Sequence, residues 1–171
     1  AALETLIRAD SADRGQPISK LGYFCAPFRP AQGPFADTVI KVYRGLGDSA
    51  ALDRLKFCHD DYVAALHAAG VPFPDTEMHL LEMDGTRVPV IVQAALPAGS
   101  MMRPLMQRES RARTLEMMEM AGRVIARFWH WADGFDGRIG FHPSIRNFAI
   151  HDGQAVFFDS FPPLIHYSRD E

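Results

Sequence analysis

Short runs of β-branched and aromatic residues, bounded by glycine and proline, dominate the first half of the chain. Residues 17–28 and 37–43 form two such runs, separated by a turn near Gly33-Pro34. A second pair, residues 77–83 and 87–97, is joined by Asp84-Gly85, a dipeptide that favours a tight hairpin turn. The pattern therefore predicts four strands, the last two of which form a hairpin.

A helix is predicted between the two pairs of strands, from residue 49 to residue 69. Its apolar positions recur at three- and four-residue steps and predict a buried stripe: Leu52, Leu55, His59, Val63 and Leu66. Asp48 or Ser49 is the expected N-cap and Gly70 the expected stop. His59 is interpreted as a core histidine. Asp60 lies at the edge of the stripe, and Asp61 is expected to point away from it.

A second helix is predicted from residue 109 to residue 132. Its apolar residues fill one face and much of the next: Leu115, Met117, Met118, Met120, Gly122, Val124, Ile125, Phe128 and Trp129. A helix with so many apolar positions is expected to be buried on most sides. We interpret its methionines as adaptable core packing rather than as a metal or cofactor site.

The most informative segment lies near the end of the chain, at residues 139–163. A polar loop ends at Asn147 and is followed by an apolar strand, a His-Asp-Gly turn at 151–153, a second apolar strand and Asp159. Such a hairpin presents an amide and a carboxylate side by side. Oxygen ligands of these two kinds suit a hard cation such as Mg²⁺, which proteins usually hold with one or two carboxylates plus phosphates.

Length and composition indicate one soluble globular domain, because 171 residues with 47% hydrophobic content bury a substantial core. No apolar run reaches the length of a membrane span, and the N-terminus lacks the pattern of a secretory signal. We therefore expect a cytoplasmic protein with no membrane partner. Cys25 and Cys58 are far apart in sequence and are expected to be half-buried free thiols.

The charge balance argues against a nucleic-acid partner, since 18 basic residues stand against 21 acidic residues. One local exception is the basic cluster Arg103, Arg108, Arg111 and Arg113. The cluster is interpreted as a solvated linker face, with contact to an anionic ligand or partner as the alternative.

Four features in chain order resemble the protein-kinase-like fold. They are a lysine within a strand (Lys41), an acidic residue on the following helix (Asp60), a loop asparagine (Asn147) and an aspartate after the next hairpin (Asp159). The passage from Ala68 to Pro74 resembles small-molecule kinases of the aminoglycoside-phosphotransferase type. This resemblance implies a single α+β domain with a two-lobed, minimal kinase-like fold. Its N-lobe, an antiparallel sheet with one helix, would span about 1–93, its hinge about 94–100, and its small, mainly helical C-lobe about 101–171.

The resemblance also implies roles for individual residues, with ATP and Mg²⁺ as the bound groups. Lys41 would contact the α- and β-phosphates, and Asp60 would orient Lys41. Asn147 and Asp159 would hold the metal. The crossing between lobes, which includes Gln93 and Ala95, would bind the adenine.

The departures from the family pattern leave the activity open. His142 stands where the family has an aspartate that accepts the proton of the attacking hydroxyl, and Asp159-Ser160-Phe161 replaces Asp-Phe-Gly. The glycine-rich phosphate loop is missing from the sequence. One hypothesis is an atypical phosphotransferase with His142 as the base and a small-molecule or protein acceptor. The other is a catalytically inactive pseudokinase that acts as a binding or regulatory module, and an unrelated α+β fold is a third possibility.

Overall fold

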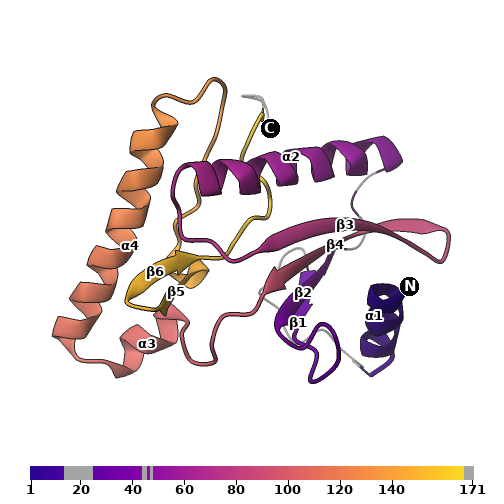
Figure 1. Cartoon of the computed structure of the whole chain (residues 1–171), viewed down its shortest axis with the longest axis horizontal. Helices are drawn as coiled ribbons and strands as arrows, with labels where there is room; N and C mark the ends of the chain where they lie inside the picture. The colour runs from indigo at the N-terminus through magenta and orange to yellow at the C-terminus, as the bar shows by residue number, and fades with distance from the viewer. Residues whose placement is uncertain (14–24, 44–45, 47, 168–171) are drawn as a thin grey trace. The chain divides into compact units, whose positions relative to one another are not determined.

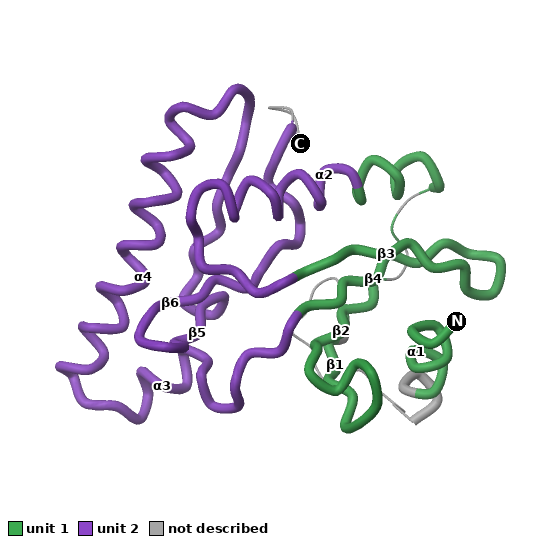
Figure 2. Tube along the Cα trace, viewed as in Figure 1, with its two compact units in different colours: residues 1–56, 76–93 green, residues 57–75, 94–171 purple. Residues whose placement is uncertain are grey.

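The computed structural model describes residues 1–13, 25–43, 46 and 48–167 of the chain, and the fold of this part is α+β (Figure 1). Its elements are α1 (Ala2–Asp13), β1 (Cys25–Phe28), β2 (Thr38–Tyr43), α2 (Ser49–Ala68), β3 (Thr76–Met83), β4 (Thr86–Ala94), α3 (Met102–Arg108), α4 (Arg111–Ala132), the short 3₁₀ helix η1 (Ile145–Asn147), β5 (Phe148–His151) and β6 (Gln154–Phe157). Figure 2 shows two compact units, residues 1–56 with 76–93 (unit 1) and residues 57–75 with 94–171 (unit 2).

Unit 1 contains a four-stranded antiparallel sheet in the order β1-β2-β4-β3. The four predicted strands are thereby confirmed in the described residues, although residues 17–24 of the first predicted strand lie outside them. The turn between β3 and β4 has positive φ angles at both central residues, 53° at Asp84 and 72° at Gly85. These angles are the ones that a two-residue hairpin turn requires, which explains the Asp-Gly sequence.

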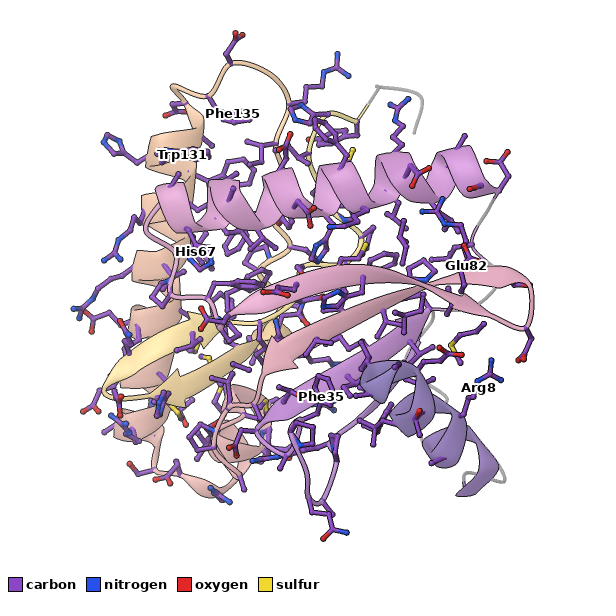
Figure 3. The ribbon with its side chains drawn as sticks, turned by 45° about the vertical axis from the view of Figure 1, so that its right-hand side comes forward. Arg8, Phe35, His67, Glu82, Trp131 and Phe135 are labelled. Carbon is purple, nitrogen blue, oxygen red and sulfur yellow. The ribbon has the colours of Figure 1, made fainter. Side chains whose placement is uncertain are left out.

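Helix α1 is an element of unit 1 that the sequence reading missed. Its buried residue Ile7 packs with apolar side chains on one face of the sheet. The members of this cluster from the sheet and its turns are Phe28, Phe35, Ile40, Val42, Leu81, Met83, Val88, Val90 and Val92. Arg8, which is labelled in Figure 3, also joins α1 to the β3–β4 turn. Its Nη1 donates to Asp84 Oδ1 at 2.8 Å. The spacing of Leu3, Leu6 and Ile7 is the helical signal in the sequence.

Helix α2 begins and ends where its capping residues predict. Asp48 Oδ1 accepts the N–H of Ala51 at 2.9 Å, which is an N-cap bond. At the other end Gly70 has a φ of 66°, and the N–H of Val71 reaches the carbonyl of Leu66 at 3.0 Å. This pattern is a Schellman motif, which stops the helix at glycine.

The buried face of α2 differs in part from the predicted stripe. Leu52, His59 and Leu66 are buried as expected, whereas Leu55 and Val63 are only half-buried. Tyr62 and Ala65 take their place in the core of unit 2. Asp61 lies outside this core, and its Oδ2 is 3.0 Å from Nε2 of His166.

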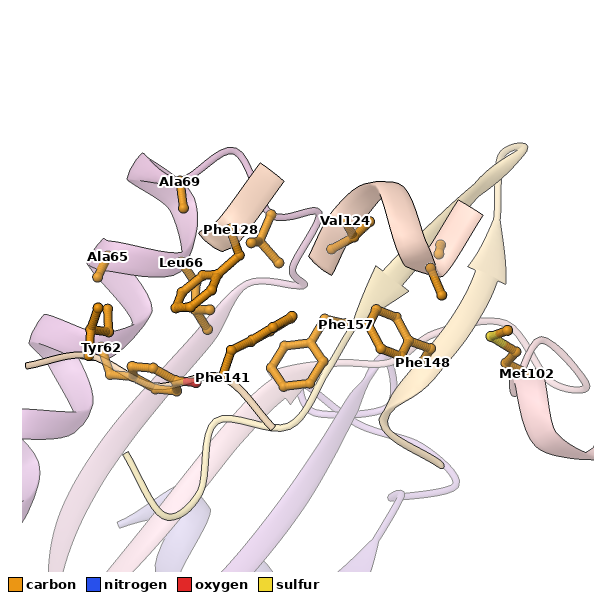
Figure 4. Packing of buried hydrophobic residues seen from close by; sticks show 14 of the residues in the cluster. Tyr62, Ala65, Leu66, Ala69, Met102, Val124, Phe128, Phe141, Phe148 and Phe157 are labelled. Atoms are coloured by element: carbon orange, nitrogen blue, oxygen red, sulfur yellow. The ribbon is translucent and has the colours of Figure 1, made fainter. Parts of the chain in front are cut away.

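The core of unit 2 is rich in aromatic rings (Figure 4). Phe128 of α4 stacks on Phe141 with ring centroids 4.5 Å apart, and Phe141 in turn lies 4.6 Å from Phe157 of β6. Tyr62 and Leu66 of α2 complete this cluster. The second half of α2, helix α4 and the β5–β6 hairpin therefore share one core.

The predicted helix from 109 to 132 is confirmed as α4, and a short helix that was not predicted, α3, precedes it. Glu109 has extended backbone angles and ends α3. Ser110 then starts α4 as its N-cap, since its Oγ accepts the N–H of Arg113 at 3.2 Å. Helix α3 is short and carries Pro104 in its first turn, where proline is tolerated, so it left little periodic signal.

The prediction that the helix from 109 to 132 is buried on most sides was wrong. Only one row of α4 is fully buried, Met117, Ala121, Val124 and Phe128. The neighbouring row is open to solvent, with exposed fractions of 56% for Leu115, 47% for Met118 and 46% for Trp129. Hydrophobicity alone did not reveal which of the two apolar rows faces the core.

None of the helices in the described residues has both the length and the apolar character needed to cross a membrane. Cys25 and Cys58 are half-buried and form no disulfide, as the sequence indicated.

Candidate functional site

The predicted metal-binding residues lie at one end of the β5–β6 hairpin. Phe148 pairs with Phe157 in the antiparallel ladder, and the next backbone bond runs from the N–H of Phe158 to the carbonyl of Asn147 at 3.0 Å. Asp159 follows directly after that bond. The structure therefore brings Asn147 and Asp159 to the open end of a single hairpin, as the sequence pattern predicted.

The amide of Asn147 has a fixed orientation. Its Nδ2 donates to the backbone carbonyl of His142 at 3.3 Å, and its own N–H donates to the carbonyl of Ser144 at 2.8 Å. Ser144 also caps η1, since its Oγ accepts the N–H of Arg146 at 3.4 Å. Because the amide nitrogen faces the loop, the amide oxygen is directed elsewhere, and within the described residues it accepts no hydrogen bond. The oxygen of Asn147 is therefore available to a ligand.

Asp159 is half-buried and weakly held by its surroundings. Its Oδ1 accepts the N–H of Phe161 at 3.4 Å, which is at the long limit of hydrogen bonding. Burial raises the pKa of the Tyr62 hydroxyl well above its usual range, and the negative charge of Asp159 raises it further. Tyr62 therefore stays neutral beside Asp159, and the carboxylate of Asp159 keeps acceptor capacity for another partner.

The donor set fits a magnesium ion that arrives with a nucleotide. Asn147 and Asp159 offer one amide oxygen and one carboxylate, which are ligands that Mg²⁺ accepts. In the part of the chain that the structure describes, no three His, Cys, Asp or Glu side chains gather into a metal-binding group. A complete protein cage is therefore not formed there, and most ligands of such an ion would come from phosphates and water.

Ser160, the residue after Asp159, is anchored to α2. Its Oγ lies 2.9 Å from Nε2 of His59, and both residues are fully buried. The core role expected for His59 is thus confirmed. On the other side of the ring, Nδ1 of His59 lies 3.9 Å from Oδ1 of Asp60, whose side chain is half exposed.

His142 is exposed and follows a tightly fixed segment. The hydroxyl of Tyr62 donates to the carbonyl of Gly140 at 3.1 Å, and the N–H of Gly140 donates to the carbonyl of Leu164 at 2.7 Å. Phe141 is buried in the core of unit 2. The backbone of His142 is therefore held on both sides, whereas its imidazole makes no hydrogen bond to any described residue.

Lys41 belongs to unit 1 and is half-buried on β2. Its neighbours Ile40 and Val42 point into the cluster with α1, so strand alternation places Lys41 on the other face of the sheet. Asp60, Asn147 and Asp159 belong to unit 2. The pairing of Lys41 with Asp60 stays a prediction.

The two predicted adenine contacts, Gln93 and Ala95, differ in what they offer. Gln93 is buried, and its Nε2 donates to Oγ1 of Thr76 at 2.9 Å, so this donor already serves the sheet. Ala94 donates its N–H to the carbonyl of Asp75 at 2.8 Å. Ala95 is half-buried, and its N–H and carbonyl are bonded to no described residue. Of the crossing residues, Ala95 is therefore the better backbone contact for a base.

An apolar pocket of about 400 Å³ lies elsewhere in unit 1. It is lined by α1 and the segment 32–35, that is, by Ala2, Thr5, Leu6, Ala9, Gln32, Pro34 and Phe35. None of the predicted site residues borders it. Its lining is almost wholly apolar, so it supplies no chemistry for the predicted reaction.

Sequence reasoning missed two supports of the site, Tyr62 and Ser160. Each acts through a contact between residues distant in the chain, Tyr62 with Gly140 and Ser160 with His59. Tyr62 had a partial signal, since it lies three residues after His59 and so shares a helix face with it.

Comparison with known proteins gives a family but no activity. No curated protein matches the chain. The model of a family described as "Family of unknown function (DUF6206)" matches residues 2–171. Because the match covers almost the entire length, the chain belongs to the DUF6206 family of unknown function.

Proposed function

We propose that this chain is a minimal, two-lobed kinase-like protein that binds ATP with Mg²⁺ and transfers a phosphoryl group to a small-molecule hydroxyl. The observation that supports this most is the hairpin end, where the oriented amide of Asn147 and the carboxylate of Asp159 come together. Antiparallel pairing of β5 with β6 fixes the two positions. The hairpin uses only the amide nitrogen of Asn147, and the unbonded amide oxygen of Asn147 supports a ligand-binding role.

In this proposal Asn147 and Asp159 hold Mg²⁺, and Lys41 contacts the phosphates. When bound, the ion neutralises charge on the phosphate oxygens during transfer. Asp60 orients Lys41, and Ala95 contacts the adenine through its backbone, with Gln93 supporting that segment from the sheet. The buried His59–Ser160 contact keeps the backbone at Asp159 in place.

His142 is proposed as the base. Its neutral imidazole accepts the proton of the acceptor hydroxyl while the hydroxyl oxygen bonds to the γ-phosphorus and the bond to ADP breaks. The backbone carbonyl of His142 is the group that orients Asn147, so base and metal ligand lie on one short loop. Their relative positions depend on η1 and its Ser144 cap.

One observation favours the alternative, a pseudokinase that binds a nucleotide or a partner without turnover. The imidazole of His142 is exposed and makes no hydrogen bond within the described part of the chain. Catalytic bases are usually oriented by a third group, which is absent here among those residues. Measured turnover distinguishes the two functions.

The first test is calorimetric titration of ATP with and without Mg²⁺. Wild type is expected to bind ATP more tightly when Mg²⁺ is present. The Asp159→Asn variant is expected to bind ATP without Mg²⁺ as wild type does but to lose the gain in affinity from Mg²⁺, because the lost charge acts through the metal. Asp152→Asn is a matched control, since Asp152 is an exposed aspartate at the opposite end of the same hairpin. Absence of ATP binding by the folded wild type would overturn the proposal.

A second measurement separates transferase from pseudokinase. Release of ADP is followed with a panel of small hydroxyl compounds as acceptors. Metal-dependent binding together with acceptor-dependent ADP release supports the transferase, and binding with no turnover of any acceptor supports the pseudokinase.

A further inference from the structure

Helix α4 carries an apolar stripe that the core of unit 2 uses only in part, through Ile125. The stripe consists of Leu115, Met118, Gly122, Ile125 and Trp129. Leu115, Met118 and Trp129 are 56%, 47% and 46% exposed, and they make up half of the six large hydrophobic side chains that are exposed in the described residues. Ile125 is half-buried and Gly122 exposed. A concentration of this kind on one helix marks an interaction surface rather than chance exposure.

The spacing of the stripe is that of a helix-pairing seam. Its residues recur at steps of three and four, the repeat with which two helices pack along their length. The fully buried row of α4, which includes Val124 and Phe128, lies on an adjacent side of the helix. Figure 2 shows α4 at the edge of unit 2. Because Leu115, Met118 and Trp129 are exposed, a partner reaches them without displacing the core. In the middle, Gly122 has open space where a side chain would begin, which allows close approach of a second helix.

The charges at the ends of α4 identify the partner. Arg111 is the first residue of the helix, and Asp133 caps its end, with Asp136 just beyond. All three are exposed, and their side chains are paired with no described residue. These signs are the reverse of what the helix dipole favours, since a helix N-terminus attracts negative charge and a C-terminus positive charge. The arrangement therefore destabilises the isolated helix, and a partner with opposite charges at these positions offsets that effect.

We propose that α4 pairs with α4 of a second copy of this chain in antiparallel orientation. Antiparallel pairing sets Arg111 of each copy beside Asp133 and Asp136 of the other, so opposite charges meet at both ends. Parallel pairing would place like charges together. The contact is isologous, as in a two-fold dimer, because the same stripe serves both copies. This helix pairing is independent of nucleotide binding, since it involves none of the residues proposed for the nucleotide site.

The first experiment measures the molar mass of the full chain by light scattering over a range of concentrations. Wild type is expected to reach the mass of a dimer, and Met118→Lys to remain a monomer with an unchanged circular dichroism spectrum. Phe57→Lys is the control, because Phe57 is more exposed than Leu115, Met118 or Trp129, at 62%, but lies on α2. A wild type that stays monomeric at about 100 µM, or a Met118→Lys variant that dimerises like wild type, overturns the proposal.

A charge-swap experiment tests the orientation. Arg111→Glu makes both ends of α4 acidic, and Asp133→Lys with Asp136→Lys makes both ends basic. Each variant alone is expected to dimerise at least 10-fold more weakly, although each change suits its own helix dipole and should not harm folding. A mixture of the two should form a mixed dimer with restored affinity. Failure of the mixture to associate, while both variants stay folded, contradicts the antiparallel arrangement.

Discussion

Ser160 Oγ lies 2.9 Å from Nε2 of His59, and this buried contact ties the residue after Asp159 to helix α2. The two residues are 101 positions apart in the chain. Because neither side chain is reached by solvent, the bond has no competition from water. The backbone that carries Asp159 therefore depends on the position of α2.

Replacing Ser160 with alanine is expected to destabilise the fold by about 1–3 kcal/mol, the usual cost when a buried polar group loses its partner. Urea unfolding measures the change. In a double-mutant cycle with His59→Phe, the two losses should be clearly non-additive because the side chains act on each other. Additive losses would show that the contact does not contribute as described. The same variant should weaken Mg²⁺-dependent ATP binding if Ser160 positions Asp159.

Tyr62→Phe should lower stability by about 1 kcal/mol at neutral pH, since it removes the hydrogen bond to the Gly140 carbonyl but keeps the ring. The pH dependence is a second readout. Burial raises the pKa of Tyr62 above that of an unfolded tyrosine, so its contribution is present below about pH 10 and is lost as the pH rises further. Wild type should therefore lose more stability than Tyr62→Phe between about pH 9 and pH 11. Parallel losses in both proteins would contradict this assignment.

The Arg87–Asp53 ion pair predicts an acid-sensitive contact within unit 1. Arg87 Nη2 donates to Asp53 Oδ1 at 2.7 Å, and Nη1 donates to Oγ of Ser49 at 2.6 Å. The bond to Arg87 lowers the pKa of Asp53, so the pair stabilises the fold above the pKa of an unfolded aspartate and is lost as the pH falls through the folded value. Asp53→Asn should be less stable than wild type at about pH 7 and equal to it at about pH 2. A difference that persists in acid would assign the effect to something other than charge.

His142→Ala should reduce kcat by roughly 10²-fold if His142 is the base, with little change in ATP affinity. Equal turnover by both proteins at every pH would exclude the role. Higher activity in His142→Asp would instead indicate that a carboxylate at this position suits the reaction better.

Local signals predicted the strands and the end of α2 well. The turn at Asp84-Gly85 and the helix end at Gly70 require positive φ angles, which few residues other than glycine adopt readily. These residues in the sequence therefore predict the hairpin turn and the end of the helix directly. The hairpin that carries Asn147 and Asp159 was predictable for the same reason, since Asp152-Gly153 forms its turn. These features depend on neighbours in the chain and need no knowledge of tertiary contacts.

Features set by distant contacts could not be predicted in the same way. Met118 and Met117 are adjacent and chemically identical, yet one is exposed and the other buried, because packing against the rest of unit 2 decides which row of α4 faces inward. Asp61 lies 3.0 Å from His166, a residue 105 positions further along the chain. Nothing in the local sequence marks such a pair.

The two units are interleaved along the chain, and this order constrains how the protein emerges from a ribosome. Unit 1 needs β4, which ends at Ala94, so residues 57–75 are synthesised before unit 1 has all its strands. Tyr62 and Leu66 then lack the rings of Phe128, Phe141 and Phe157 that cover them in the native core. The last of those rings, Phe157, is synthesised about sixty residues after the end of β4 at Ala94, which takes several seconds at ordinary translation rates. During that interval the second half of α2 is a nascent apolar segment without its core, and it is therefore open to non-native contacts.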